Sequence, residues 1–326
     1  MIDAFLASVG WADALISPLA GDASARAYSR LQRGGTSAIL MQDPTGDVGR
    51  FASLSRHLID LGLSAPQILA EDFATGLLLI EDLGDGLFAR LTAVDPARET
   101  PLYLAAADTL LSLHRHAPPP LDKATPDHLA QMTDLAFDCY LAAAAGAAAP
   151  QDKADCRAAM ADALNTYAPD TDVMILRDFH AENLLWLPDR VGAARTGLLD
   201  FQDALQGHRA YDLASLLTDV RRDVTPATCQ AVIRHYVDQS GLPDTPFRAA
   251  LAVLGAQRNL RILGVFARLA ANGKPRYLEL MPRVWSHLQR DLAHPALGRI
   301  AATLHPVMPP PDPEIIARLR QTCPMQ

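Results

Sequence analysis

Short runs of alternating hydrophobic and polar residues fill the first eighty positions of the chain. They predict three brief strands separated by glycine-rich turns and then two more strands, after an N-terminal helix that ends near residue 14. The five strands are expected at 15–19, 27–31, 37–42, 67–70 and 77–81. Between the third and fourth, apolar residues at 51, 54, 58 and 61 have helical spacing, and Gly62 is a suitable helix end. We therefore expect a small antiparallel sheet with one helix.

Helical spacing dominates after the segment Leu83-Gly84-Asp85-Gly86, which breaks the strand pattern and is predicted to be a hinge. Amphipathic helices are expected near 100–116, 127–145, 152–166, 210–221, 226–239, 247–271 and 276–292, with a last short helix near 313–321. The pattern predicts an α+β fold with a sheet domain at 1–83 and a larger, mostly helical domain at 84–326.

Polar residues interrupt the apolar runs at two places that are close in sequence. In the segment 175–187, Asp178 and Asn183 lie five positions apart, and in the segment 197–204, Asp200 follows an apolar run. The flanking apolar residues predict short buried strands that would hold these groups rigidly. Carboxylate and amide oxygens are the ligands that Mg²⁺ prefers, and a further carboxylate can orient a substrate hydroxyl. The two segments predict metal-assisted phosphoryl transfer.

Each of these motifs is weak when it is taken alone. An aspartate followed five residues later by asparagine also occurs in turns, where both side chains cap backbone amides. The order of strand, Asp178, Asn183, strand, turn, strand and Asp200 favours the phosphotransferase interpretation.

The amino-acid composition limits the classes of molecule that the protein is expected to bind. Of the 326 residues 49% are hydrophobic, which is enough for a sizeable core, and 29 basic against 37 acidic residues give a net charge of −8. This balance argues against a nucleic-acid or membrane partner and favours a small-molecule substrate. The four cysteines lack zinc-ligand spacing, and the first 25 residues carry no basic residue. We expect a soluble cytoplasmic protein with free thiols; its oligomeric state stays open.

Five longer motifs carry a family resemblance: Leu-Ala-Gly-Asp-Ala-Ser-x-Arg-x-Tyr at 19–28, Ile-Glu-Asp-Leu-Gly-Asp at 80–85, Leu-Asp-Phe-Gln-Asp-Ala at 199–204, the arginine-bearing segment 257–269, and Gly-Lys-Pro-Arg-Tyr-Leu at 273–278. With the strand-rich first part and helical second part, the chain resembles the aminoglycoside phosphotransferase and choline kinase family, which has a bilobal, protein-kinase-like fold. Within that family it is most similar to bacterial kinases that phosphorylate N-acetylmuramate and N-acetylglucosamine on the anomeric hydroxyl during cell-wall recycling.

The resemblance implies ATP and Mg²⁺ as cofactors and a role for each motif residue. Asp178 would be the catalytic carboxylate, and Asn183 and Asp200 would bind the metal. The turn containing Gly21, Asp22 and Ser24 would cover the ATP phosphates, although an ordinary hairpin turn explains it equally well. The backbone from Glu81 to Leu83 would meet the adenine.

One departure from protein kinases concerns the cation that holds the phosphates. Protein kinases pair a strand lysine with a helix glutamate, but the first lysine here is Lys123 and the first glutamate is Glu71. Met41, or a neighbour in the segment 37–42, occupies the expected strand position. Arg26 or Arg30 is the natural substitute because a guanidinium gives bidentate bonds to phosphate. Solvated strand arginines, or a catalytically inactive pseudokinase, are the alternatives.

The acceptor site is predicted from charged residues in an otherwise apolar helix. Arg258 and Arg261 would pair with an anionic group of the acceptor, or they belong to a solvated basic stripe with Arg268. Asp203 would accept a sugar hydroxyl or cap a turn, and Asp212 is expected to brace the catalytic loop.

The favoured function is ATP- and Mg²⁺-dependent phosphorylation of an N-acetylated amino sugar. The alternatives are a kinase of an aminoglycoside, choline or a related amino alcohol, and a nucleotide-binding pseudokinase. Unrelated nucleotide folds are disfavoured because the chain has no Gly-x-x-x-x-Gly-Lys-Ser/Thr motif.

Overall fold

The computed structural model describes residues 1–19, 26–43, 47–146 and 149–321. The chain forms two compact units, each of which contains two stretches of sequence. Unit 1 comprises Met1–Pro119 and Ala181–Ala204, and unit 2 comprises Pro120–His180 and Leu205–Gln326. Unit 1 contains residues on both sides of the predicted domain boundary between residues 83 and 84. That boundary between two domains stays a prediction.

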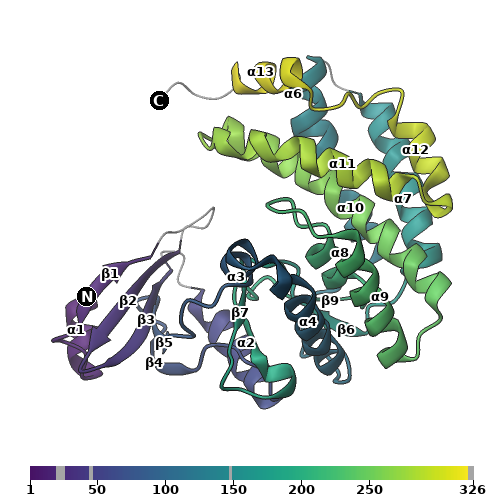
Figure 1. Ribbon diagram of the computed structural model, residues 1–326. Helices are drawn as coiled ribbons and strands as arrows, with labels where there is room; N and C mark the ends of the chain where they lie inside the picture. Colours follow the sequence, from purple (N-terminus) through teal and green to yellow (C-terminus); the bar gives the residue numbers. More distant parts are fainter. Residues whose placement is uncertain (20–25, 44–46, 147–148, 322–326) are drawn as a thin grey trace. The chain divides into compact units, whose positions relative to one another are not determined.

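Unit 1 is built on a five-stranded antiparallel sheet with the strand order β1-β2-β3-β5-β4 (Figure 1). The strands are β1 (Leu15–Pro18), β2 (Ala27–Arg33), β3 (Thr36–Gln42), β4 (Ile68–Asp72) and β5 (Leu77–Glu81). Each overlaps a strand predicted from the alternation of polar and apolar residues, so the predicted small antiparallel sheet is confirmed.

The two faces of this sheet differ in chemistry. Leu31, Leu40 and Leu79 are buried on one face, where they form a core with Phe5 and Leu6 of α1 (Ile2–Ser8). Residues of opposite parity occupy the other face, where Tyr28 pairs with Met41 and Arg30 pairs with Ile39. This second face therefore carries the charged Arg30 beside apolar residues of β3.

The rest of unit 1 consists of helices and one hairpin. The helices are α2 (Val48–Asp60), α3 (Phe88–Val94) and α4 (Glu99–Leu113), with short 3₁₀ turns at Pro96–Arg98 and Gly192–Arg195. The hairpin pairs β7 (Leu184–Trp186) with β8 (Thr196–Leu198). Its strands carry Asn183 immediately before β7 and Asp200 two residues after β8.

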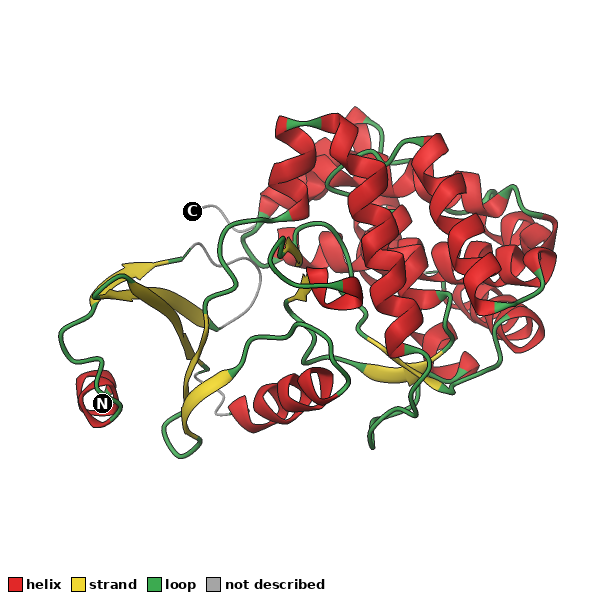
Figure 2. Ribbon diagram, turned by 60° about the horizontal axis from the view of Figure 1, so that its bottom comes forward, coloured by secondary structure: helices red, strands yellow, loops and turns green. Residues whose placement is uncertain are grey.

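Unit 2 is mostly helical, as the red ribbons of Figure 2 show. Its helices are α5 (Pro126–Met132), α6 (Ala142–Ala145), α7 (Pro150–Tyr167), α8 (Tyr211–Leu217), α9 (Pro226–Ser240), α10 (Asp244–Ala271), α11 (Met281–Leu292), α12 (Gly298–Leu304) and α13 (Pro313–Gln321). Short 3₁₀ turns lie at Pro275–Leu280 and Pro295–Leu297. A two-stranded sheet pairs β6 (Val173–Ile175) with β9 (Leu205–Gly207).

The long helix α10 is central to unit 2, and α11 packs along it (Figure 1). Gly264 lets α10 approach another segment closely, because a Cβ atom there would lie 2.2 Å from the Leu135 carbonyl. That segment was predicted as one helix over 127–145, but α5 ends at Met132 and a π-helical turn occupies Ala136–Leu141. The close contact with Gly264 lies next to the π-helical turn that interrupts the predicted helix. Local sequence does not indicate this contact.

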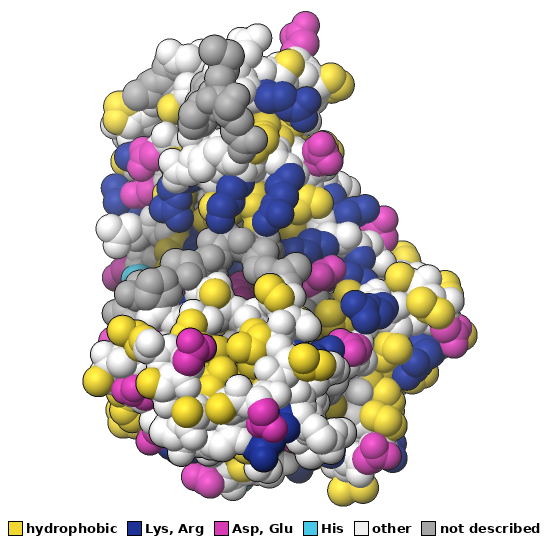
Figure 3. Space-filling view, turned by 90° about the vertical axis from the view of Figure 1, so that its left-hand side faces the viewer, with side chains coloured by type: hydrophobic (Ala, Val, Ile, Leu, Met, Phe, Trp, Pro, Cys, Tyr) yellow, Lys and Arg dark blue, Asp and Glu magenta, His cyan; other side chains and the backbone are white. Residues whose placement is uncertain are grey.

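The α+β class is confirmed by the sheet of unit 1 and the helices of unit 2. None of the helices in the described ranges is long and apolar enough to cross a membrane. Leu15, Ile16 and Leu69 of the sheet are exposed, and on the face in Figure 3 hydrophobic side chains are scattered among charged ones. Scattered exposed apolar residues of this kind are ordinary for a protein surface.

Candidate active site

The loop that carries Asp178 begins with a strained residue. Arg177 follows the buried Leu176 and has a left-handed backbone with a φ of 71°. Asp212 at the start of α8 accepts hydrogen bonds from the backbone N–H of Leu176 at 2.6 Å and of Arg177 at 2.8 Å. Left-handed conformations of non-glycine residues persist where surrounding contacts enforce them, often at functional sites. Asp212 therefore holds the start of this loop in place, which is the role that the sequence analysis predicted for it.

Asp212 is fully buried, and burial raises the pKa of its carboxyl to about 6. The two backbone N–H donors favour the charged form and limit this rise. At neutral pH the carboxylate is mostly ionised and can accept both hydrogen bonds.

Arg258 of α10 completes the same brace. Its guanidinium donates to the carbonyl oxygen of Arg177 at 3.0 Å and to the Ser215 hydroxyl at 2.6 Å. The Ser215 hydroxyl also donates to that carbonyl, and the Arg258 guanidinium lies 4.8 Å from the centre of the Tyr211 ring. These contacts occupy a side chain that we predicted to bind the acceptor. Acceptor binding by Arg258 stays a prediction, while its contacts favour a supporting role.

Arg261, one helical turn along α10, has a different environment. It is half-buried, and burial lowers the pKa of its guanidinium, with the cations Arg177 and Arg258 adding to the effect. Asp178 opposes this shift, so Arg261 lies within electrostatic range of the predicted catalytic carboxylate. Of the two predicted acceptor arginines, Arg261 is the better placed to act beside Asp178.

His180 lies two residues after Asp178 and is buried. Its Nε2 atom is 3.2 Å from a guanidinium nitrogen of Arg221, a residue that the sequence analysis did not single out. Burial lowers the pKa of His180 to about 3, and Arg221, Arg258 and Arg222 act in the same direction. A neutral imidazole with so low a pKa is a poor proton acceptor at pH 7. His180 is therefore not favoured as the group that accepts a proton.

In unit 1 the β7–β8 hairpin brings Asn183 and Asp200 together. The Asn183 Nδ2 atom lies 3.5 Å from Asp200 Oδ2, and the backbone N–H of Leu199 donates to the Asn183 carbonyl. Asp200 is exposed and has a left-handed backbone with a φ of 56°. Gln202, which sequence analysis also missed, donates from Nε2 to Asp200 Oδ1 at 2.7 Å. The two predicted metal ligands are thus neighbours, and one of them is held by a third side chain.

These oxygens fit Mg²⁺, which is a hard cation that takes one or two protein oxygens together with substrate phosphates. Rotation of the Asn183 amide would turn its oxygen toward Asp200, since amide orientation follows hydrogen bonding. Within the described ranges no cluster of three or more His, Cys, Asp or Glu could hold a metal.

Arg26 and Arg30 occupy the second face of the sheet and have different partners. Arg30 contacts Asp82 at 2.8 Å and Asp85 at 3.1 Å, so two carboxylates neutralise it and it ties β2 to the segment after β5. Arg26 is ion-paired with the buried Asp43 at 2.9 Å and interacts electrostatically with Asp203.

Tyr28 places this arginine near Asp200, one of the two predicted metal ligands. Burial raises the pKa of Tyr28 to about 12, Arg26 opposes the rise and Asp200 adds to it. Tyr28 is opposite the fully buried Met41, the residue at the expected lysine position. Arg26 therefore lies at the Asp200 end of this face.

The remaining predicted nucleotide residues are only partly described. Gly21, Asp22 and Ser24 lie outside the described residues. The Glu81 side chain contacts Arg190 at 2.5 Å, and its backbone N–H donates to the Gln67 carbonyl. A Cβ atom at Gly197 would come within 3.3 Å of the Leu83 side chain, so Leu83 packs closely on β8.

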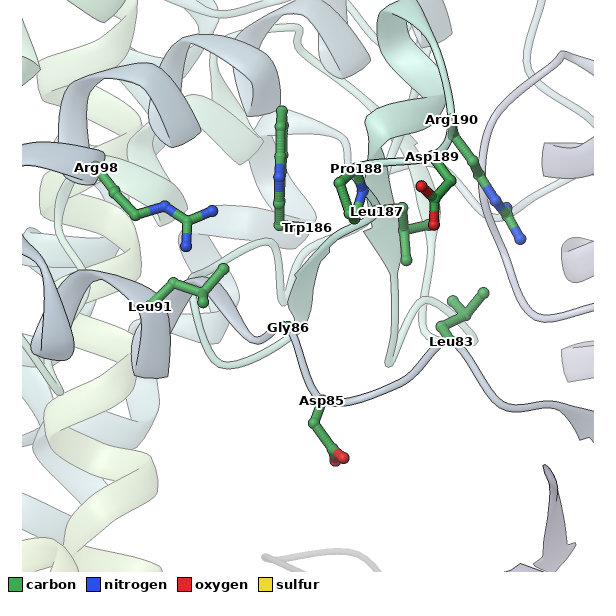
Figure 4. Close-up of a pocket in the computed structure, with 10 residues that line it drawn as sticks. All are labelled: Leu83, Asp85, Gly86, Leu91, Arg98, Trp186, Leu187, Pro188, Asp189 and Arg190. Atoms are coloured by element: carbon green, nitrogen blue, oxygen red, sulfur yellow. The ribbon is translucent and has the colours of Figure 1, made fainter. Parts of the chain in front are cut away.

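A pocket of about 540 Å³ lies beside the segment after β5 (Figure 4). Its lining comprises Leu83, Asp85, Gly86, Leu91, Arg98, Trp186, Leu187, Pro188, Asp189 and Arg190. Leu83 is the one lining residue among those predicted for the site. Neither Asn183 nor Asp200 lines this pocket.

Comparison with known sequences gives consistent relatives. The model of the phosphotransferase enzyme family matches residues 15–251. An N-acetylmuramate/N-acetylglucosamine kinase of Caulobacter vibrioides is 39% identical over 358 aligned positions, which cover 92% of this chain and 93% of the relative. The kinase of the same name from Pseudomonas aeruginosa is 30% identical, with coverage of 90% and 91%.

Solved structures share the fold at low sequence identity. A choline/ethanolamine kinase family protein from Mesorhizobium loti has a TM-score of 0.66 and 17% identity, and 98% of each chain is covered. A macrolide 2′-phosphotransferase from Brachybacterium faecium has a TM-score of 0.53 and 15% identity, with coverage of 91% and 96%. These neighbours confirm the predicted bilobal, protein-kinase-like fold class.

Proposed function

The chain belongs to the phosphotransferase enzyme family, and from this premise we propose that it transfers the γ-phosphoryl group of ATP to the anomeric hydroxyl of an N-acetylated amino sugar. N-acetylmuramate and N-acetylglucosamine are the proposed acceptors because two relatives bear these names and align over nearly their whole length. The observation that carries the chemistry is the pairing of Asn183 with Asp200, next along the chain to the braced loop of Asp178.

In this proposal Asp178 accepts the proton of the anomeric hydroxyl while that oxygen forms a bond to the γ-phosphorus. The bond between the γ-phosphorus and the bridging oxygen breaks, and ADP leaves with the electron pair. Asn183 and Asp200 would hold Mg²⁺, which neutralises phosphate charge when it is bound. The left-handed Arg177, fixed by Asp212, Ser215 and Arg258, sets the direction in which the next residue, Asp178, leaves the strand.

We assign the role of the missing strand lysine to Arg26. Its neighbours Tyr28 and Asp203 lie at the Asp200 end of the sheet face, whereas Arg30 is already matched by two carboxylates. Asp43 would orient the guanidinium as the helix glutamate orients the lysine in protein kinases. Gly21, Asp22 and Ser24 would cover the phosphates, and Met41, Glu81 and Leu83 would contact the rest of the nucleotide.

For the acceptor we propose Arg261 as the partner of an anionic group, such as the carboxylate of N-acetylmuramate, and Asp203 as a partner of a sugar hydroxyl. Several arginines act on the group around Asp178, including Arg221 and Arg222 near His180. A surplus of cations disfavours cationic acceptors such as choline or an aminoglycoside. The reaction would take place in the cytoplasm, where ATP is available, and would return cell-wall sugars to metabolism.

The test compares four acceptors with ATP and Mg²⁺: N-acetylmuramate, N-acetylglucosamine, choline and an aminoglycoside. We expect ATP-dependent phosphorylation of the two sugars, and Asp178→Ala should lower turnover by about 10² to 10⁴ with the fold intact. Asp127→Ala, at an exposed position in the first turn of α5, is the control and should leave turnover unchanged. Normal turnover of Asp178→Ala would reject the catalytic assignment. Nucleotide binding without transfer to any acceptor would indicate a pseudokinase.

A further inference from the structure

The first turn of α2 is bonded to the segment that follows Asp200. Arg50 donates from Nε to the Gln202 carbonyl at 2.6 Å and from a terminal nitrogen to the Ala204 carbonyl at 2.9 Å. Next to it, the buried rings of Phe51 and Phe201 are stacked with their centres 4.9 Å apart. All of these groups lie in unit 1. One helix turn therefore fixes the backbone on both sides of residue 203.

This contact continues to the metal ligand itself. Gln202 is buried, with 4% of its surface exposed, and its amide donates to Asp200 Oδ1 at 2.7 Å. Arg50 therefore holds the backbone of a residue whose side chain holds Asp200. Since Asp200 has a left-handed backbone, its conformation depends on such surrounding contacts.

We propose that Arg50 is a positioning residue for the metal: it acts through Gln202 to fix the Asp200 carboxylate in the orientation that binds Mg²⁺. This inference rests on the proposed function, in which Asp200 is a metal ligand. In protein kinases the corresponding helix supplies a glutamate to the lysine pair, but α2 contains no glutamate. Here α2 contributes to the nucleotide site through Arg50 instead.

The chemistry of the contact requires arginine in particular. Two carbonyl oxygens two residues apart are bound by two different nitrogens of one planar guanidinium, which a lysine ammonium cannot reproduce with the same geometry. Gln202 in turn occupies one oxygen of Asp200 and leaves Oδ2 on the side of Asn183. The orientation of Asp200 is thus set by neighbours before any metal binds.

The experiment measures how much Mg²⁺ strengthens the binding of ADP to the protein. Calorimetric titration of ADP is carried out with and without Mg²⁺ on the wild type and on Arg50→Ala, Arg50→Lys and Arg56→Ala. Loss of a residue that orients a metal ligand typically weakens metal affinity about 10-fold to 100-fold. In the wild type, ADP affinity should rise with Mg²⁺ concentration to a plateau. We expect Arg50→Ala to raise the Mg²⁺ concentration that gives half of this increase in ADP affinity by at least about 10-fold. ADP affinity without Mg²⁺ should be unchanged.

The controls separate this effect from general damage to α2. Arg56 lies on the same helix as Arg50 and forms an exposed ion pair with Glu71 of β4. Arg56→Ala removes this ion pair and should behave as the wild type. Arg50→Lys should recover only part of the Mg²⁺ response. If Arg50→Ala does not fold, Gln202→Ala tests the same link from its other end and should weaken the Mg²⁺ response by a similar factor.

Asp200→Asn distinguishes failure of this inference from failure of the proposed function. If Asp200→Asn keeps the wild-type Mg²⁺ response, Asp200 is not the metal ligand and the proposed function is wrong on this point. If Asp200→Asn loses the response while Arg50→Ala and Gln202→Ala keep it, the metal assignment holds and the positioning role of Arg50 is overturned.

Discussion

Arg258→Met tests whether Arg258 braces the catalytic loop or binds the acceptor. Methionine fills much of the space of the arginine stem but removes all donors. The change deletes hydrogen bonds to the Arg177 carbonyl and the Ser215 hydroxyl and the contact with Tyr211. Hydrogen bonds from a charged donor contribute about 1.5 to 3 kcal/mol each and a cation–π contact about 0.5 to 2 kcal/mol. The two hydrogen bonds and the cation–π contact together predict a loss of about 3.5 to 8 kcal/mol in the free energy of unfolding.

The same substitution should lower kcat because the left-handed Arg177 loses one hydrogen bond directly, and Ser215, which also bonds to Arg177, loses the donor that holds its hydroxyl. A displacement of about 1 Å in a reacting group can lower the rate about 100-fold. The loss should be equal with N-acetylmuramate and N-acetylglucosamine, since a brace does not sense the acceptor's charge. Chemical denaturation and initial rates with both sugars measure these quantities.

Arg258→Lys keeps the charge and guards against a variant that does not fold, and Arg268→Ala, exposed on the same helix, is the control. The bracing role would be refuted by wild-type stability together with a rise in KM confined to N-acetylmuramate. That selective rise is instead the expected result for Arg261→Ala, which we propose to face the anionic group.

Three further predictions concern nucleotide binding, pH and packing. Arg26→Ala should weaken ADP binding about 10-fold to 100-fold and leave adenosine binding unchanged, whereas Arg33→Ala, at the far end of the strand that follows Arg26, should affect neither; calorimetry with both ligands checks this. Burial raises the pKa of Asp291 to about 7, so the folded form binds the carboxyl proton more tightly than the unfolded form. The stability that this bound proton contributes is lost as pH rises from about 4 to 7. Asp291→Asn should therefore gain stability over the wild type at pH 8, by up to about 4 kcal/mol, and little at pH 4; denaturant titrations at both values test it, and a constant difference would contradict the pKa. Gly264→Ala should lower the melting temperature by many degrees because of the clash with the Leu135 backbone, while Gly298→Ala, at an open position in α12, should not.

Local sequence patterns predicted the sheet and the long helices because these elements follow the periodicities of 2 and 3.6. They missed α3 and α12, each of seven residues, and the three-residue β9, which are too short for a periodic pattern. The predicted helix over 127–145 is helical along most of its length but is interrupted by a turn at residue 133 and a π-helical segment at 136–141, where α10 approaches through Gly264. Tertiary contacts of this kind are not encoded in local periodicity.

The candidate site could be predicted only for residues that belong to local motifs. Asp178, Asn183 and Asp200 have a recognisable spacing, and Asp212 follows them in a short helix. Arg50 and Gln202 could not be predicted, since Arg50 bonds to a carbonyl 152 positions away and carries no motif. The left-handed backbone of Arg177 and Asp200 is equally hidden, because arginine rarely has a positive φ and aspartate has one in only a small share of its positions.

The proposed reaction is phosphoryl transfer to the anomeric oxygen of an N-acetylated amino sugar. To test it, the protein is incubated with N-acetylmuramate, ATP and Mg²⁺, and the phosphate in the product is located by ³¹P and ¹³C NMR. We expect phosphate on the C1 oxygen, with loss of the sugar's reducing end and one ADP formed for each product. Phosphate on the C6 oxygen, or ATP consumption without a phosphorylated sugar, would contradict it.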